Sequence, residues 1–449
     1  MKGQIIQATP FEFLNVIEYH GTLSLDEHGI VIIKGIIKTD KEKRYLQLIS
    51  EGVWTEIFKS NEDGSSLMLF CGVAMEGQIN AYGNVKELTL KVVTGSCLMD
   101  VEEHTRSFEN ANITRKEILK YLMSNYAEEG VVVNTKYDAR LGGYLCQYKE
   151  TDWQFIKRIA SSCSAHIIPN YVNRGVKIFF GCPSQAKSKI VNDNEYSIKK
   201  SNGTTCYKVK QREVYNLGEE LCFQGHQVVV TRINTTMEGS EIYHNYELTE
   251  VKGIKSQQIH NEKLIGISLI ATVLEIKAEK VQLEIQEDEY RADVKKWFSY
   301  ATVYSSTDGT GWYCMPEPGD TVRLYFPSDK ENEAFVMNAV HMESSDSSER
   351  VNPDYKSIMN KYGKEILITP SSLILTNNAG MTVELSDDKG VVIVSDKQIE
   401  IKSEDAITLI SAQGKIDMAA QKAITLQQGN TSMVLSEKLR LQGARVKME

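Results

Sequence analysis

Residues 366–449 repeat one short unit, in which two apolar residues flank a third, mostly polar one, at a spacing of about eight residues. Period-two alternation over three to five residues predicts a β-strand, and its fixed recurrence predicts a repeat architecture. Turn-forming residues such as Asn377-Asn378-Ala379-Gly380 and Asp387-Asp388-Lys389-Gly390 separate the units. We therefore expect a ribbon of very short strands joined by turns.

Such a ribbon has one apolar face that it cannot bury alone, because isolated short strands are marginal in water. Either the chain coils on itself as a solenoid, or several copies wind together around a shared core. About ten short strands would make only about three turns of a single-chain coil, whereas three intertwined copies would make a closed prism about 50 Å long. We favour the prism. The residues expected in its core are Ile366, Ile368, Leu373, Leu375, Val383, Leu385, Val391, Ile393, Ile399, Ile401, Ile407, Leu409, Ile416, Met418, Ile424, Leu426, Met433, Leu435, Leu439 and Leu441.

Length, net charge and histidine spacing disfavour several classes of function. A chain of 449 residues suggests three or four domains. A net charge of -9 without a basic run argues against nucleic acid, whose phosphates require clustered Lys and Arg. The eight histidines lack ligand spacing, so neither a metal nor a cofactor is expected. The N-terminus lacks the apolar segment of a signal peptide, and we expect synthesis in the cytoplasm.

Strand and helix patterns divide the chain before the repeat. The expected segments are a β-barrel at 1–100, a small α+β unit at 101–190, a second barrel at 191–260 and a compact five-stranded barrel at 261–342. A polar linker at 343–365 then leads to the repeat at 366–449, which we call the needle.

The α+β unit has the clearest local signals. Thr114 to Glu117 and Thr151 to Gln154 match the capping box that opens a helix. After the second helix, the segments 166–169 and 176–180 read as a hairpin.

In the five-stranded barrel, a Gly-rich loop leads into Trp312 and Tyr313, and Pro318-Gly319 then makes a turn. These two aromatic residues could stack on a sugar or a base, since small barrels of this class bind oligomers. Packing in the core of this barrel, the neck of the molecule, or at a subunit interface is the favoured role of both residues.

Together these features resemble the spike and hub proteins of contractile injection machines. That family includes the valine-glycine-repeat proteins of type VI secretion and the fused hub and spike of contractile phage tails and phage-tail-like bacteriocins. The resemblance rests on three features, which are the helix stretch Tyr148–Ala160, the loop 311–320 and the octad repeat.

The resemblance implies a mainly β, multidomain fold with barrel hub domains, an oligonucleotide/oligosaccharide-binding (OB) fold neck and a C-terminal triple-stranded β-helix. It also implies a homotrimer whose N-terminal ring docks on tail tube or baseplate proteins and whose needle punctures the target cell envelope. The protein would then reside in a phage tail or a tail-like particle. Some relatives carry a muramidase domain between neck and needle, but the linker here has no room for one. Others end in a His-x-His site, whereas the last histidine here is His341, so a separate tip-capping protein is expected.

Two other functions stay open. A trimeric receptor-binding fibre or adhesin would suit the same needle, and a polysaccharide-degrading β-helix enzyme is the third possibility. The acidic pairs Asp387-Asp388 and Glu404-Asp405 could serve as catalytic carboxylates or Ca²⁺ ligands, but they fall at expected turns and are interpreted as solvated. We therefore expect a structural protein without catalytic activity.

Overall fold

The computed structural model describes residues 5–60, 65–183, 189–191, 193–201, 203–239, 241–254, 256–340, 351–442 and 444–445. The chain forms two compact units, Met1–Met342 and Glu343–Glu449. Within the described ranges, no helix is long and apolar enough to cross a membrane.

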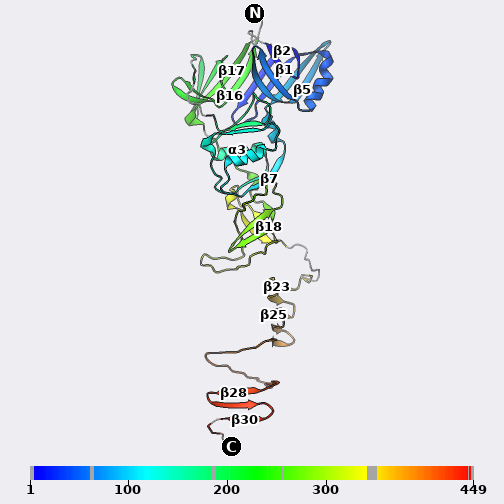
Figure 1. Ribbon diagram of the computed structural model, residues 1–449, viewed down its shortest axis with the longest axis vertical. Coiled ribbons are helices and arrows are strands. Elements are labelled where there is room, and N and C mark those ends of the chain that lie inside the picture. The colour runs from blue at the N-terminus through cyan, green and yellow to red at the C-terminus, as the bar shows by residue number, and fades with distance from the viewer. Residues whose placement is uncertain are drawn as a thin grey trace. The chain divides into compact units, whose positions relative to one another are not determined.

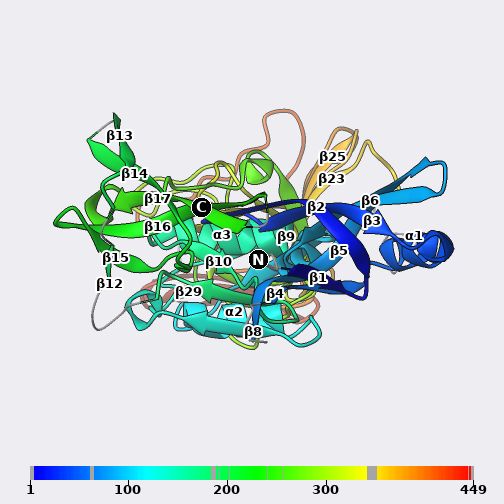
Figure 2. The ribbon, with the colours of Figure 1, turned by 90° about the horizontal axis from the view of Figure 1, so that it is seen from above.

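One large sheet dominates the first unit (Figures 1 and 2). Its main path runs through β1 (Ile5–Thr9), β4 (Trp54–Ser60), β5 (Ser66–Tyr82), β6 (Val85–Val93), β3 (Ile30–Ile37), β2 (Phe13–Ser24), β16 (His226–Glu238), β17 (Glu241–Glu250), β14 (Thr204–Gln211) and β13 (Tyr196–Ser201). Two short strands branch from it, β15 (Glu220–Phe223) beside β16 and β12 (Lys189–Val191) beside β15. Helix α1 (Glu42–Ser50) lies against β5.

The two strand-rich segments at 1–100 and 191–260 meet in this sheet. Strand β2 pairs antiparallel with β16, with Gly21 opposite Thr235. Figure 2 shows the strands of the two segments on opposite sides of that seam, in blue and green. Alternating side chains of β3 and β17 point into one continuous hydrophobic core. The segments expected as separate barrels thus share one sheet and one core.

A second core belongs to the α+β region. Helix α2 (Arg115–Met123) and helix α3 (Asp152–Ser162) both begin with the expected capping box. The expected hairpin is also confirmed, because β10 (Ile167–Pro169) pairs antiparallel with β11 (Lys177–Phe180). The remaining strands of this region are β8 (Gly130–Val133), parallel to β11, and the pair β7 (Glu103–Phe108) and β9 (Leu145–Thr151).

The third core, which we call the neck, contains a sheet in the order β20 (Phe298–Ser299), β19 (Lys280–Ile285), β18 (Ser268–Lys277), β21 (Thr321–Tyr325) and β22 (Phe335–Ala339). A bridge from Tyr300 to Val336 links the two ends of this sheet. Tyr144 and Cys146, which flank the start of β9, are buried in the neck core. The α+β region and the neck therefore share side chains across their boundary.

The second unit contains two antiparallel meanders of consecutive strands. The first comprises β23 (Lys356–Met359), β24 (Glu365–Ile368), β25 (Ser372–Thr376), β26 (Thr382–Ser386) and β27 (Gly390–Val394), and the second comprises β28 (Ile424–Gln428), β29 (Thr431–Leu435) and β30 (Leu439–Gln442). Strand β23 lies inside the segment expected to be a linker, so strand pairing begins earlier than the repeat pattern indicates.

Residues 395–423, all of them described, form no strand within one chain. The repeat nevertheless predicts strands there, at 399–401, 407–409 and 416–418. Their apolar alternation is present, but one chain supplies no neighbouring strand to pair with their backbone groups.

Candidate functional site

The candidate site in the second unit is an apolar sheet face. Across the first meander, Ile366, Leu375, Val383 and Ile393 stand opposite one another on successive strands. Ile368, Leu373, Leu385 and Val391 form the neighbouring row. Residues two apart on a strand point to the same side, so both rows belong to one face. The structure thus brings these eight predicted core residues together on one surface.

That face is open to solvent within one chain. The exposed fractions of its eight side chains run from 37% for Leu373 to 67% for Val391. The opposite face of the same strands, which carries Leu367, Ile374 and Glu384, is half-buried. The side chains expected to point inward are therefore the more exposed ones in the isolated chain.

The same pattern continues toward the C-terminus. In the second meander, Ile424 is opposite Leu435, and Leu426 is opposite Met433. Met433 and Leu435 in turn face Leu441 and Leu439. Between the meanders, the six predicted core residues are 51–71% exposed and have no strand partners in the chain. They are Ile399, Ile401, Ile407, Leu409, Ile416 and Met418.

The two acidic pairs considered as catalytic or Ca²⁺-binding residues are exposed, as expected for solvated carboxylates. Asp387 and Asp388 are exposed in the turn between β26 and β27, and Glu404 and Asp405 are exposed between the meanders. In the part of the chain that the structure describes, no group of three or more His, Cys, Asp or Glu side chains is arranged to hold a metal ion.

Trp312 and Tyr313 do not belong to the core of the neck in this chain. Their side chains are 58% and 72% exposed and line a hollow of about 510 Å³. Packing inside the neck of one chain is therefore excluded for both, and packing against another subunit stays a prediction.

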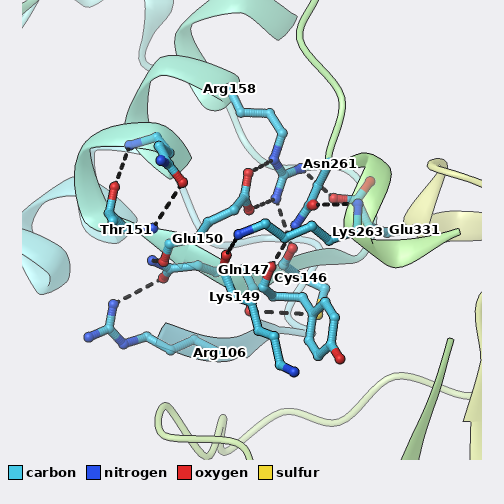
Figure 3. Close-up of polar contacts among 12 residues, drawn as sticks. Arg106, Cys146, Gln147, Lys149, Glu150, Thr151, Arg158, Asn261, Lys263 and Glu331 are labelled. Atoms are coloured by element: carbon cyan, nitrogen blue, oxygen red, sulfur yellow. Dashed lines mark hydrogen bonds and ion pairs between the residues drawn. The ribbon is translucent and has the colours of Figure 1, made fainter. Parts of the chain in front are cut away.

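The first unit has a second feature of interest, a buried polar joint between the α+β region and the neck (Figure 3). The Arg158 guanidinium on α3 donates to both carboxylate oxygens of Glu150, each at 2.8 Å, and to the carbonyl of Cys146 at 2.8 Å. Its Nη1 donates to Glu331 of the neck at 2.5 Å. The Arg158 side chain is 6% exposed, and Glu150 and Glu331 are 8% and 13% exposed. One buried cation thus holds carboxylates from both sides of the joint.

The backbone at the end of β9 is shaped for this joint. Lys149 has a left-handed φ of +47° and sits where the pairing of β7 with β9 shifts register. The resulting bulge presents carbonyl groups to the neck. Asn261 Nδ2 donates to the carbonyl of Tyr148 at 2.8 Å, and Lys263 Nζ donates to that of Lys149 (Figure 3).

A neighbouring ion pair secures the start of α3. Arg106 Nη1 donates to the fully buried Asp152 at 2.5 Å and to Gln147 at 3.0 Å. The Tyr126 hydroxyl donates to the other oxygen of Asp152 at 2.7 Å, and burial together with that bond raises the pKa of Tyr126. The stretch 148–160, one of the three features on which the resemblance rests, thus supplies several residues of this joint.

Two buried carboxyls complete the contact with the neck. Asp288 accepts from the backbone N–H of Ser107 at 2.9 Å, and Glu109 pairs with Lys295 at 3.1 Å. Burial raises the pKa of both carboxyls. These residues could not be predicted from the sequence, because periodicity indicates which side of an element is buried and does not identify a partner in another domain.

Solved structures with this fold are known. A Francisella PdpA–VgrG complex described as half-lidded matches with a TM-score of 0.57 at 7% identity, over 88% of this chain and 88% of that one. The lidless form matches with a TM-score of 0.53 at 7% identity, over 84% and 93%. An E. coli component of the type VI secretion system, described as similar to the T4 bacteriophage tail proteins gp27 and gp5, matches with a TM-score of 0.52 at 10% identity, over 75% of this chain and 100% of that one.

No protein-family model matches the chain, and no curated protein matches its sequence. The structural matches, each of which spans most of both chains, show the fold: it is shared with a VgrG-containing complex and with a type VI secretion component described as similar to phage tail proteins. This VgrG-like fold is multidomain and mainly β.

Proposed function

We propose that this protein is the structural hub and cell-envelope-puncturing spike of a contractile injection machine, and that it acts as a homotrimer without a catalytic step. One observation carries the proposal, namely the apolar face of the second unit, which is exposed in the single chain. Full burial of a Val, Leu or Ile side chain stabilises by about 1.5–3 kcal/mol. A face with so many of them is expected to be covered in the working protein.

The pairing of the strands favours other copies as the cover. Consecutive strands pair antiparallel in both meanders, whereas a single-chain parallel solenoid pairs strands that are a full turn apart. The unpaired repeat at 395–423 needs backbone partners as well. Three copies would supply both, because each apolar face becomes one wall of a prism and the central repeats pair between chains.

The rest of the proposal follows the resemblance and the fold. The large sheet of the first unit would form the ring that docks on tail tube or baseplate proteins, and the neck would be an OB-fold. The needle would meet the target envelope, with a tip-capping protein as a further partner. The particle could be a phage tail, a bacteriocin or a secretion system. The VgrG-like fold supports this proposal. A hub and spike has a use for the N-terminal half of the chain, whereas an adhesin or a polysaccharide-degrading enzyme would not need it.

Light scattering on the full chain, before and after warm detergent, tests the proposal. We expect the mass of three chains and a detergent-resistant second unit, because unfolding one copy of a shared prism requires unfolding all three. A single-chain mass would overturn the proposal. A trimer that binds cell-wall glycan and fails to co-sediment with tail tubes would instead favour the fibre function.

A further inference from the structure

Residues 301–315 form an arm of the neck that is closed by its own hydrogen bonds. Its two sides are tied together by hydrogen bonds from Trp312 N to Tyr304 O at 2.9 Å, from Ser306 N to Thr310 O at 2.8 Å, and from Thr302 Oγ1 to Trp312 O at 2.8 Å. Gly311 makes the close approach possible. Its φ is +145°, and a Cβ added there would lie 2.4 Å from the carbonyl oxygen of Tyr304. The arm therefore has a defined shape of its own.

The arm exposes several large apolar and aromatic side chains and is nearly uncharged. Val303 is 87% exposed, Tyr304 is 53% exposed, and Trp312 and Tyr313 are 58% and 72% exposed. The one charged residue in the segment is Asp308. Exposed aromatic residues without neighbouring charges are typical of the core of a protein–protein interface.

A hollow of about 510 Å³ lies along the inner side of the arm. Its walls include Glu279, Ser299 and Tyr300 from the body of the neck, and Trp312, Tyr313 and Cys314 from the arm. The Tyr313 hydroxyl donates to the carbonyl of Ala278 at 3.1 Å, which fixes that ring across the hollow. The neck thus has a protruding apolar surface and a concave surface next to it.

We propose that the arm is an intersubunit clasp, in which the arm of one copy packs into the hollow of the next copy of this chain. This inference rests on the trimer proposed above. Two different surfaces that fit each other make a head-to-tail contact, and such a contact closes into a ring under threefold symmetry.

Chain connectivity supports a second copy as the occupant. Strand β22 ends at Ala339 and β23 begins at Lys356, so 16 residues, 340–355, join neck and needle. Such a segment reaches at most about 55 Å. Three necks joined through one needle are then held at an effective concentration on the order of millimolar. Weak apolar surfaces on the necks would therefore associate.

Thiol labelling of the full chain tests the clasp, because Cys314 is the exposed cysteine and it lies in the hollow. Maleimide modification of Cys314 is followed by peptide mass mapping, with the urea-unfolded chain as the reference for a free thiol. We expect labelling in the native trimer to be at least about tenfold slower than in the reference. Gly311→Ala, which distorts the arm, and Trp312→Ser, which removes its largest side chain, should each restore fast labelling while light scattering still reports three chains.

The outcomes separate this inference from the proposed function. A three-chain mass with Cys314 labelled at the reference rate would overturn the clasp and leave the spike intact. A one-chain mass would overturn both. If labelling slowed only after addition of a chitin oligosaccharide, the hollow would be a sugar site and the clasp would be wrong.

Discussion

Arg158 on helix α3 and Glu331 in the neck form a buried ion pair, with Nη1 and Oε1 2.5 Å apart, although the two residues are 173 positions apart in the chain. The same guanidinium binds Glu150 through two of its nitrogens. The joint between the α+β region and the neck is thus fixed by a shared cation with planar, bidentate geometry. In the proposed spike, such a joint would resist rotation of one part against the other.

Removal of the shared cation should be far more damaging than neutralisation of one partner. Arg158→Met leaves Glu150 and Glu331 buried without a counter-charge, and we expect a loss of about 3–5 kcal/mol in the free energy of unfolding. Glu331→Gln keeps the bidentate pair with Glu150 and should lose much less. Urea titration followed by tryptophan fluorescence measures both, since the buried Trp153 lies on the same helix.

The matched control is Arg212→Met. Arg212 pairs with Glu241 on the surface, with 65% of its side chain exposed, and surface pairs contribute little. Equal effects of Arg158→Met and Arg212→Met would show that the joint does not depend on the buried cation.

A substitution at Lys149 should raise the free energy of unfolding, whereas the substitution at Arg158 lowers it. A non-glycine residue with φ +47° carries strain that glycine does not. Glycine avoids about 1–2 kcal/mol of left-handed strain and loses about 0.5–1 kcal/mol to the added freedom of the unfolded chain. Lys149→Gly should therefore raise the free energy of unfolding by roughly 0.5–1 kcal/mol. Lys120→Gly, in helix α2, should lower it by about 1 kcal/mol. Thermal unfolding distinguishes the two, and destabilisation at both sites would show that the Lys149 side chain matters more than its backbone.

Local features of the fold could be predicted from the sequence because their causes are local. Both capping boxes and the hairpin at 167–180 depend on residues close together in the chain. The pairing of β2 with β16 could not be predicted, because alternation shows that a strand has a buried face and does not show which strand lies beside it. For the same reason, the partners of Arg106 and Arg158 could not be predicted from the sequence.

The candidate site, too, could be predicted from the sequence only in part. The repeat placed Ile366, Leu375 and Val383 on one face correctly, since register follows from period two. It could not show that one chain leaves residues 395–423 without strand partners. For Trp312 and Tyr313, the sequence favours packing in a core or at a subunit interface, but a glycine-rich approach to an aromatic pair fits an exposed arm equally well.

His244 should make the large sheet sensitive to acid. It is 6% exposed beside Thr235, and burial lowers its pKa from 6.5 to about 4. The unfolded chain binds a proton near pH 6.5 while the folded chain does not, so stability falls as the pH drops through this window. The expected loss between pH 7 and pH 5 is about 2 kcal/mol. His244→Gln should reduce this pH dependence, and His20→Gln, at an exposed position on β2, should leave it unchanged. Urea midpoints at pH 7 and pH 5 measure this change in stability. An equal change in wild type and in His244→Gln would show that His244 is not the group responsible.

The register of the proposed needle can be tested at adjacent residues. Ile401 is 71% exposed in the single chain and is expected to face the shared axis, so Ile401→Asp would place three carboxylates together in an apolar core. Burial of like charges at that distance is strongly unfavourable, and trimer assembly should fail or the melting temperature should fall steeply. Leu409→Asp should behave alike. Glu400, whose carboxylate pairs with Lys402 at 2.7 Å, is expected to point outward, and Glu400→Asp should be nearly silent. Light scattering and detergent resistance report the assembly, and equal effects at 400 and 401 would show that the inward register is wrong.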